Sequence, residues 1–160
     1  MDRLKDKVAI ITGAAAGIGE ATARLFAQEG ASVALCDLAM EPLNNLAESI
    51  NSEGGKAVAF KCNIANEAEV KDLVASTIQA FGKIDILINN AGITRDAVAI
   101  RMSEENWDLV MDVNLKGSFL CCKAVLTKIQ RGGKIVNTAS ISTLGNPGQA
   151  NYAASKMGVI

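Results

Sequence analysis

The chain has 160 residues, with 16 Lys and Arg against 17 Asp and Glu, for a net charge of −1. This even balance argues against a general nucleic-acid binder, which needs a concentration of basic side chains. The chain also contains no histidine. Ser-His hydrolases, Cys-His nucleophile pairs and histidine-based zinc sites are therefore excluded, and no metal site is predicted. Any general acid must be Tyr, Lys, Cys, Asp or Glu.

Hydropathy gives no sign of a membrane protein. The N-terminal segment lacks the apolar core of a signal peptide, and no stretch approaches the roughly 20 apolar residues of a membrane span. The four cysteines show no C-x-x-C spacing and lie in apolar surroundings, as expected of buried thiols in a reducing compartment: Cys36, Cys62, Cys121 and Cys122. We expect a cytoplasmic protein without a membrane partner, folded as one domain over residues 1–160.

Short apolar runs alternate with helical periodicity along the chain. Runs this short and continuous are typical of parallel strands that are buried on both faces. They cover residues 8–11, 32–36, 56–61, 84–88 and 134–139. Strands that alternate with helices predict an α/β fold, a doubly wound parallel sheet with right-handed crossovers.

Helices are predicted between the strands. The first has an apolar face and ends near Gly30; its face comprises Ile18, Ala21, Thr22, Leu25 and Phe26. Asn66 is predicted to cap the third helix. The helical pattern from Ser103 to about Gln130 stops at Arg131-Gly132-Gly133 and contains Asn114, an unfavourable residue in mid-helix that needs a reason such as a functional hydrogen bond.

The first strand leads into a glycine-rich turn. It reads Thr12-Gly13-Ala14-Ala15-Ala16-Gly17-Ile18-Gly19. Between a strand and a helix, such a turn indicates a dinucleotide site, because Gly13 and Gly17 let the backbone approach a pyrophosphate and Gly19 lets the helix pack closely. The alternative is a plain tight turn.

Two further strand ends carry candidate cofactor residues. Asp37 follows the second strand, where a carboxylate can accept hydrogen bonds from the adenosine ribose and would repel a ribose phosphate. The sequence therefore favours NAD over NADP, with a helix-capping or turn aspartate as the alternative. The fourth strand runs into Asn89-Asn90-Ala91-Gly92, whose small residues let a ligand come near the backbone.

Tyr152 and Lys156 stand four residues apart, so a helix would stack them on one face. The positive charge favours the phenolate, which suits the pair to proton transfer. Ser140 follows the fifth strand, where its hydroxyl could polarise a carbonyl. A Tyr-x-x-x-Lys pair alone is common on amphipathic helices, but together with the glycine turn it indicates a catalytic site.

Together, T-G-x-x-x-G-I-G (12–19), N-N-A-G (89–92), Asn114, Ser140 and Y-x-x-x-K (152–156) resemble the short-chain dehydrogenase/reductase family. Within that family, the segments 90–96 and 145–156 are similar to bacterial β-ketoacyl-acyl-carrier-protein reductases. Asn63-Ile64 after the third strand is similar to that subgroup as well.

The resemblance implies a Rossmann-like sheet of order 3-2-1-4-5 and hydride transfer between a nicotinamide and a carbonyl/alcohol pair. Tyr152 would be the general acid in reduction, Lys156 would favour its ionised form and bind the nicotinamide ribose, Ser140 would hold the substrate oxygen, and Asn114 would position a water. The implied cofactor contacts are Gly13, Ala16, Gly17, Ile18 and Gly19 at the pyrophosphate, Asp37 at the adenosine ribose, Asn63 and Ile64 at the adenine, and Asn90, Ala91 and Gly92 on the nicotinamide side. Tyr152 and Lys156 are implied cofactor contacts as well.

Three features differ from that subgroup. Its members usually use NADPH, whereas this glycine turn has no basic residue and Asp37 opposes a phosphate. The spacing from Ser140 to Tyr152 is one residue short, which makes Ser142 a weaker candidate for the serine role. The chain stops four residues after Lys156, so we expect a C-terminally truncated domain that lacks the substrate lid and is inactive or poorly soluble alone.

The leading prediction is a 3-oxoacyl-thioester reductase, with acyl carrier protein as a candidate partner. Arg131 could dock such a carrier, or it could be a solvated turn residue. One alternative is a dehydrogenase of another secondary alcohol, such as a sugar, polyol, steroid or hydroxyacyl-CoA. Another is a dinucleotide-binding fragment without catalysis. The resemblance also implies a homo-oligomer, a tetramer or dimer packed through the 103–130 helix.

Overall fold

Five parallel strands form the central sheet of the computed structural model, which describes residues 2–160. Their spatial order is β3-β2-β1-β4-β5, as predicted. The strands are β1 (Val8–Thr12), β2 (Ser32–Asp37), β3 (Lys56–Lys61), β4 (Ile84–Asn89) and β5 (Ile129–Asn137). The first four match their predicted ranges to within one residue.

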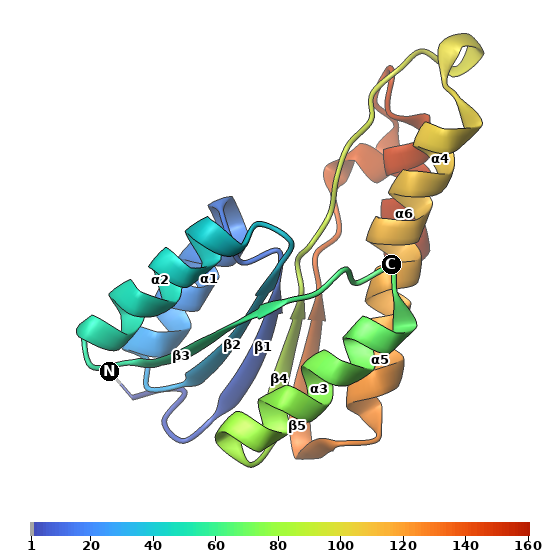
Figure 1. Cartoon of the computed structure of the whole chain (residues 1–160). Coiled ribbons are helices and arrows are strands. Elements are labelled where there is room, and N and C mark those ends of the chain that lie inside the picture. Colours follow the sequence, from blue (N-terminus) through green and yellow to red (C-terminus); the bar gives the residue numbers. More distant parts are fainter. Residues whose placement is uncertain (1) are drawn as a thin grey trace.

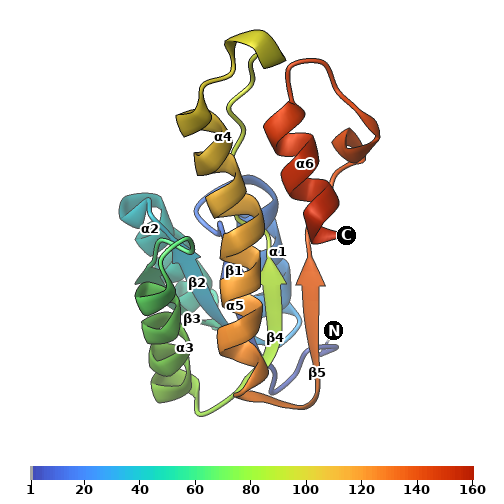
Figure 2. The ribbon, with the colours of Figure 1, turned by 90° about the vertical axis from the view of Figure 1, so that its right-hand side faces the viewer.

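Helices cover both faces of the sheet (Figure 1). Helices α1 (Gly17–Gln28) and α2 (Met40–Ser52) lie on one face, and α3 (Glu67–Phe81) and α5 (Gly117–Leu126) lie on the other. Beyond the carboxyl ends of β4 and β5, α4 (Glu104–Met111) packs beside α6 (Ala150–Val159) (Figure 2). Among the described residues, no helix combines the length and apolar character that crossing a membrane requires.

The continuous apolar strands follow from this two-sided cover. All five residues of β1 are buried, and successive side chains point to opposite faces. Ile11 and Leu35 join the cluster under α1 and α2, whereas Ile10 and Leu87 join the cluster under α3 and α5. Each strand therefore needs apolar residues on both faces, which explains why the pattern does not alternate.

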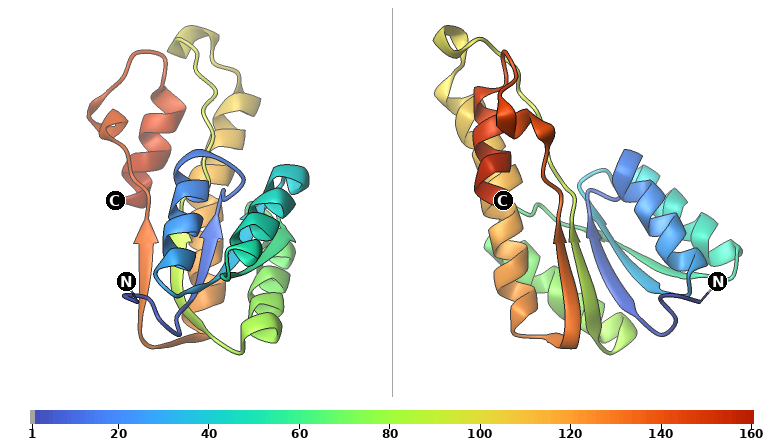
Figure 3. Two further views of the ribbon diagram at one scale, coloured as in Figure 1. Left: turned by 90° about the vertical axis from the view of Figure 1, so that its left-hand side faces the viewer. Right: turned by 180° about the vertical axis from the view of Figure 1, so that it is seen from behind.

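The apolar face predicted for the first helix is wrong at Ile18 and Leu25, whereas Phe26 packs against the core as predicted. Ile18 and Leu25 are 70% and 48% exposed, and the buried residues of α1 are Gly19 and Ala23 (Figure 3 shows the face that α1 covers). A Cβ on Gly19 would overlap the carbonyl oxygen of Gly13. The helix lies so close to the turn that two small residues, Gly19 and Ala23, form the most buried part of its inner face.

The single helix predicted over 103–130 is also corrected. Helix α4 passes into a π-helical segment (Asp112–Lys116) and then into α5, which ends at Leu126. Asn114 lies in that wide turn. A π-helical turn interrupts the regular hydrogen-bond pattern and is frequent at functional sites, so the polar residue in mid-helix coincides with a real irregularity.

The fifth strand was predicted over residues 134–139, whereas β5 begins earlier, at Ile129, and ends earlier, at Asn137. The Gly132-Gly133 pair, expected to break the chain, lies within β5, where the register with β4 shifts between Ile84 and Ile86. Gly132 has a φ of +84°, and a Cβ on Gly133 would come within 2.7 Å of the Asp85 carbonyl oxygen. The glycines accommodate a bulge beside β4 and do not end an element.

The predicted cap of the third helix is confirmed. The Asn66 side chain accepts hydrogen bonds from the backbone N–H groups of Ala68 (3.0 Å) and Glu69 (3.5 Å). The cap anchors the start of α3 directly after Asn63 and Ile64, two of the predicted adenine contacts.

Candidate functional site

The site lies where the chain reverses its winding direction, between β1 and β4. Connections that leave these two strands run to opposite faces of the sheet, which opens a crevice at their carboxyl ends. Thr12 at the end of β1 is completely buried and connects the two strand ends. Its hydroxyl donates to the Ile88 carbonyl (3.3 Å) and accepts from the N–H groups of Asn90 (3.1 Å) and Ala91 (3.0 Å).

Asn90 reinforces the same junction. Its side-chain Nδ2 donates to the carbonyls of Thr12 (3.0 Å) and Gly13 (3.2 Å). Asn90 was predicted on the nicotinamide side of a ligand, but its amide is turned inward and holds the glycine turn. Thr12 was not singled out from the sequence, although a hydroxyl in the last place of an apolar strand was an available signal.

The glycine turn has the geometry that a diphosphate needs. Gly13 and Gly17 adopt φ values of +67° and +59°, and a Cβ on Gly17 would meet no atom within 4 Å. Ala16 is the N-cap of α1 and provides no side-chain hydrogen bond to the first-turn N–H groups. These oriented N–H groups beside open space fit the phosphates of a dinucleotide.

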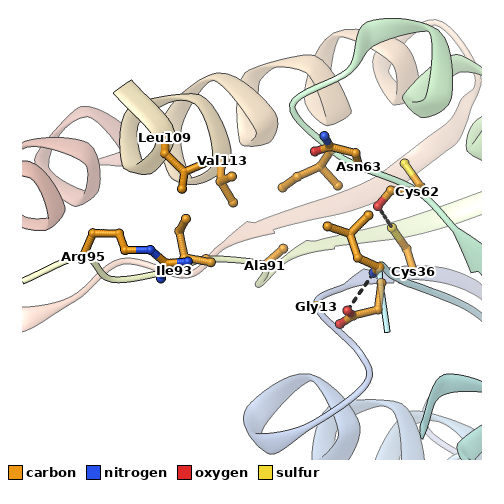
Figure 4. A pocket seen from close by; sticks show the side chains of 13 residues that line it. Gly13, Cys36, Cys62, Asn63, Ala91, Ile93, Arg95, Leu109 and Val113 are labelled. Carbon is orange, nitrogen blue, oxygen red and sulfur yellow. Dashed lines mark hydrogen bonds between the residues drawn. The ribbon is translucent and has the colours of Figure 1, made fainter. Parts of the chain in front are cut away.

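A cleft of about 310 Å³ runs along the carboxyl ends of the strands. Figure 4 shows Leu109 and Val113 on one side of it and Gly13 and Cys36 on the other. Six of the predicted cofactor residues line it: Gly13, Asp37, Asn63, Ile64, Ala91 and Gly92. Ala16, Gly17, Ile18 and Gly19 lie on the glycine turn and the first turn of α1, and are not among the lining residues.

Asp37 is fixed in place by the backbone. Its Oδ2 accepts from the N–H of Ala15 (3.1 Å), and its Oδ1 accepts from the N–H groups of Leu38 (2.7 Å) and Ala39 (3.1 Å). The carboxylate thus forms a local turn and lines the cleft at the same time. The two interpretations offered for this residue are therefore compatible.

Tyr152 and Lys156 lie on α6 with the Lys156 Nζ 5.9 Å from the centre of the phenol ring. The lysine is buried, with 3% of its surface exposed, and its Nζ donates to the Thr138 carbonyl at 2.7 Å. This burial lowers the pKa of Lys156, because the charged form loses hydration.

Asn114 and Gly92 meet Lys156 at the end of the cleft. The Asn114 Oδ1 accepts from the Ile93 N–H (2.8 Å), while Nδ2 donates to the Ile93 carbonyl (3.0 Å) and to Ser155 Oγ (3.1 Å). A Cβ on Gly92 would lie 3.3 Å from Asn114 Oδ1 and 3.5 Å from Lys156 Nζ. Glycine at this position therefore leaves room where the two polar groups converge.

Ser140 is not joined to these residues. Its hydroxyl accepts from the Ser142 N–H (3.1 Å) and caps the short helix η3 (Ile141–Leu144). Within residues 2–160, no direct hydrogen bond links Ser140 to Tyr152 or Lys156. The hydroxyl proton stays available for another acceptor.

Comparison with known proteins identifies the family. The model of the short chain dehydrogenase family matches residues 7–160. The chain belongs to this family. The fold agrees, because a short chain dehydrogenase from Mycobacterium smegmatis superposes with a TM-score of 0.95 at 34% identity, covering 99% of this chain and 69% of that one.

Two curated family members are similar in sequence. The 3-oxoacyl-[acyl-carrier-protein] reductase FabG of Thermotoga maritima is 50% identical over 99% of this chain and 65% of its own length. The (2S)-[(R)-hydroxy(phenyl)methyl]succinyl-CoA dehydrogenase subunit BbsD of Thauera aromatica is 41% identical over 98% of this chain and 64% of its own length. The chain thus spans slightly less than two thirds of these two relatives.

Replacing Lys156 with Met should reveal the cost of burying its charge. An unfolded lysine titrates near 10.5, and the folded chain binds fewer protons between the lowered pKa and that value. The free energy of unfolding therefore rises with pH across this window. At lower pH the buried ammonium is fully charged and destabilises the folded chain by its full desolvation cost. We predict that Lys156→Met is favoured relative to wild type near neutral pH and that this advantage shrinks as the pH approaches 10.5.

Urea unfolding at several pH values measures this difference, with the exposed Lys128→Met as the control. The control should change stability by the same amount at each pH. A Lys156→Met difference that is equally independent of pH would contradict the assignment of a penalised buried ammonium.

Proposed function

We propose that this chain forms the dinucleotide-binding and proton-donating part of an NAD-dependent reductase of 3-oxoacyl thioesters. The observation that carries the proposal is that Lys156, whose Nζ lies 5.9 Å from the centre of the Tyr152 ring, meets Asn114 beside Gly92, a residue of the Asp37-lined cleft. The cleft fits a dinucleotide, and the pair at its end fits a proton donor for a carbonyl.

The bound nicotinamide would supply the hydride. Tyr152 would donate its proton to the carbonyl oxygen, and the Lys156 cation would stabilise the phenolate that remains. Ser140 would donate its free hydroxyl proton to the substrate oxygen. The Asn114 side chain already uses both N–H donors on Ile93 and Ser155, so its backbone carbonyl, which accepts from Ser118 Oγ at 2.8 Å, would be the group that positions a water.

The thioester class is supported by the relatives. The Thermotoga protein is named for an acyl-carrier-protein substrate, and the Thauera subunit for a CoA substrate. Both names denote thioesters. We therefore prefer an acyl carrier protein as partner and retain a hydroxyacyl-CoA as the second candidate, favoured by the 41% identity to BbsD.

The cofactor preference follows from charge. Asp37 presents a fixed carboxylate at the cleft, and the glycine turn from Gly13 to Gly17 holds no basic side chain. A ribose phosphate would meet repulsion without compensation, so NAD is the proposed cofactor. A homo-oligomer packed through the helices of residues 104–126 and a cytoplasmic location are also proposed, the latter because all four cysteines are free thiols.

Replacing Tyr152 with Phe removes the proton donor and nothing else. We predict that NADH oxidation with an acetoacetyl thioester falls by about 10²- to 10⁴-fold in the full-length protein. Dinucleotide affinity should stay within about twofold, since the phenol oxygen is not part of the cleft lining. Equal rates in wild type and variant would remove Tyr152 from the mechanism.

Replacing Asp37 with Ala should relax cofactor choice. Wild type should bind NADH more tightly than NADPH, and Asp37→Ala should reduce that preference about tenfold or more, which corresponds to about 1.4 kcal/mol. Isothermal titration with both nucleotides measures it. Asp72→Ala, with the same charge change on the exposed face of α3, should preserve the wild-type preference, and tighter NADPH binding by wild type would overturn the assignment.

A further inference from the structure

Helix α6 carries a second pair of polar residues beside the one proposed for chemistry. Asn151 and Ser155 have the same spacing as Tyr152 and Lys156 and are displaced from them by one residue. Both are completely buried. Burying polar side chains is unfavourable unless they are hydrogen-bonded, and the reaction proposed above assigns these two no role.

Asn151 connects three parts of the site. Its Nδ2 donates to the carbonyls of Arg95 (3.0 Å) and Asn106 (3.2 Å), and its Oδ1 accepts from the N–H of Tyr152 (2.8 Å). Arg95 belongs to the segment that follows Gly92, and Asn106 belongs to α4. Both donors of this amide are used, so its orientation is determined.

Ser155 makes the second connection. Its hydroxyl donates to the Tyr152 carbonyl (2.8 Å) and accepts from Asn114 Nδ2 (3.1 Å). Asn114 in turn binds both backbone groups of Ile93. The segment from Ile93 to Arg95 is therefore held at two points, and both points lead to the same stripe of α6.

We propose that Asn151 and Ser155 are positioning residues that fix the rotation of α6 about its axis, and thereby the direction in which Tyr152 projects. A rotation of about 10° would move the phenol oxygen by roughly 1.5 Å, given the helix radius and the length of the side chain. A displacement of about 1 Å can cost about 10²-fold in rate. Apolar packing tolerates small rotations, whereas directional hydrogen bonds do not.

This inference rests on the proton-donor role proposed for Tyr152, and one variant separates the two. Asn151→Asp keeps the size of the side chain and the acceptor for the Tyr152 N–H but, when ionised, cannot donate to Arg95 and Asn106. The matched control is Asn146→Asp, since Asn146 is an exposed amide five residues earlier that bonds only to Gln149.

Three measurements on the full-length protein are informative: kcat and KM for an acetoacetyl thioester, the Kd for NADH, and the near-ultraviolet titration of the phenol. Tyr152 is the only tyrosine of residues 1–160, and its signal in the full-length protein is isolated as the difference between each protein and its Tyr152→Phe counterpart. Asn151→Asp should lower kcat about tenfold or more and shift the titration midpoint, with the Kd for NADH within about twofold of wild type. Asn146→Asp should behave as wild type throughout.

A second variant pair protects the test against misfolding. Ser155→Ala should lower kcat, and Ser155→Thr, which keeps the hydroxyl, should restore it. An unchanged kcat and titration in Asn151→Asp, or a loss of NADH affinity in step with kcat, would overturn the inference and leave these residues a structural role only. Wild type without thioester turnover would refute the proposed function, while the titration would still test the positioning of Tyr152.

Discussion

The buried hydroxyl of Thr12 joins the two loops on which the dinucleotide site is built. It is bound to the end of β4 by one donated and two accepted hydrogen bonds, and the Asn90 amide returns two more to the glycine turn. These bonds lie where the connections after β1 and β4 run to opposite faces of the sheet, and without the bonds the two loops would separate. The close approach of Gly19 to Gly13 and the wall made by Ala91 and Gly92 both depend on this junction.

A separate set of hydrogen bonds holds the part of the site that is proposed to transfer the proton. Asn114 in the π-helical segment and Asn151 and Ser155 on α6 connect the chain after Gly92 to the helix that carries Tyr152. Lys156 sits within this frame as a buried cation bonded to Thr138. Its burial is unfavourable for folding, and this is typical of groups retained for function at a cost in stability.

Apolar runs and the glycines between them are local signals, and from them the sequence predicted the positions of the strands; the family resemblance added the sheet order and six of the residues that line the cleft. The sequence failed where packing distance decides. The face of α1 is set by the contact of Gly19 with Gly13, and periodicity cannot show that Ile18 and Leu25 face outward. Likewise, the Gly132-Gly133 pair is typical of a turn between elements, and only the pairing with β4 shows that it lies within a strand. Asn151 and Ser155 look like surface residues in sequence, and only the folded chain reveals that α4 and the segment after Gly92 bury them.

The role of the Thr12 hydroxyl is tested most directly by the NADH affinity of Thr12→Val, which keeps the shape of the side chain but removes its hydroxyl. The Ala91 N–H would lose its acceptor, at a cost of about 1–3 kcal/mol in stability. The Kd for NADH should rise about tenfold or more. Thr22→Val, whose hydroxyl bonds only within α1, should bind as wild type. Wild-type affinity in Thr12→Val would contradict the claim that this hydroxyl organises the site.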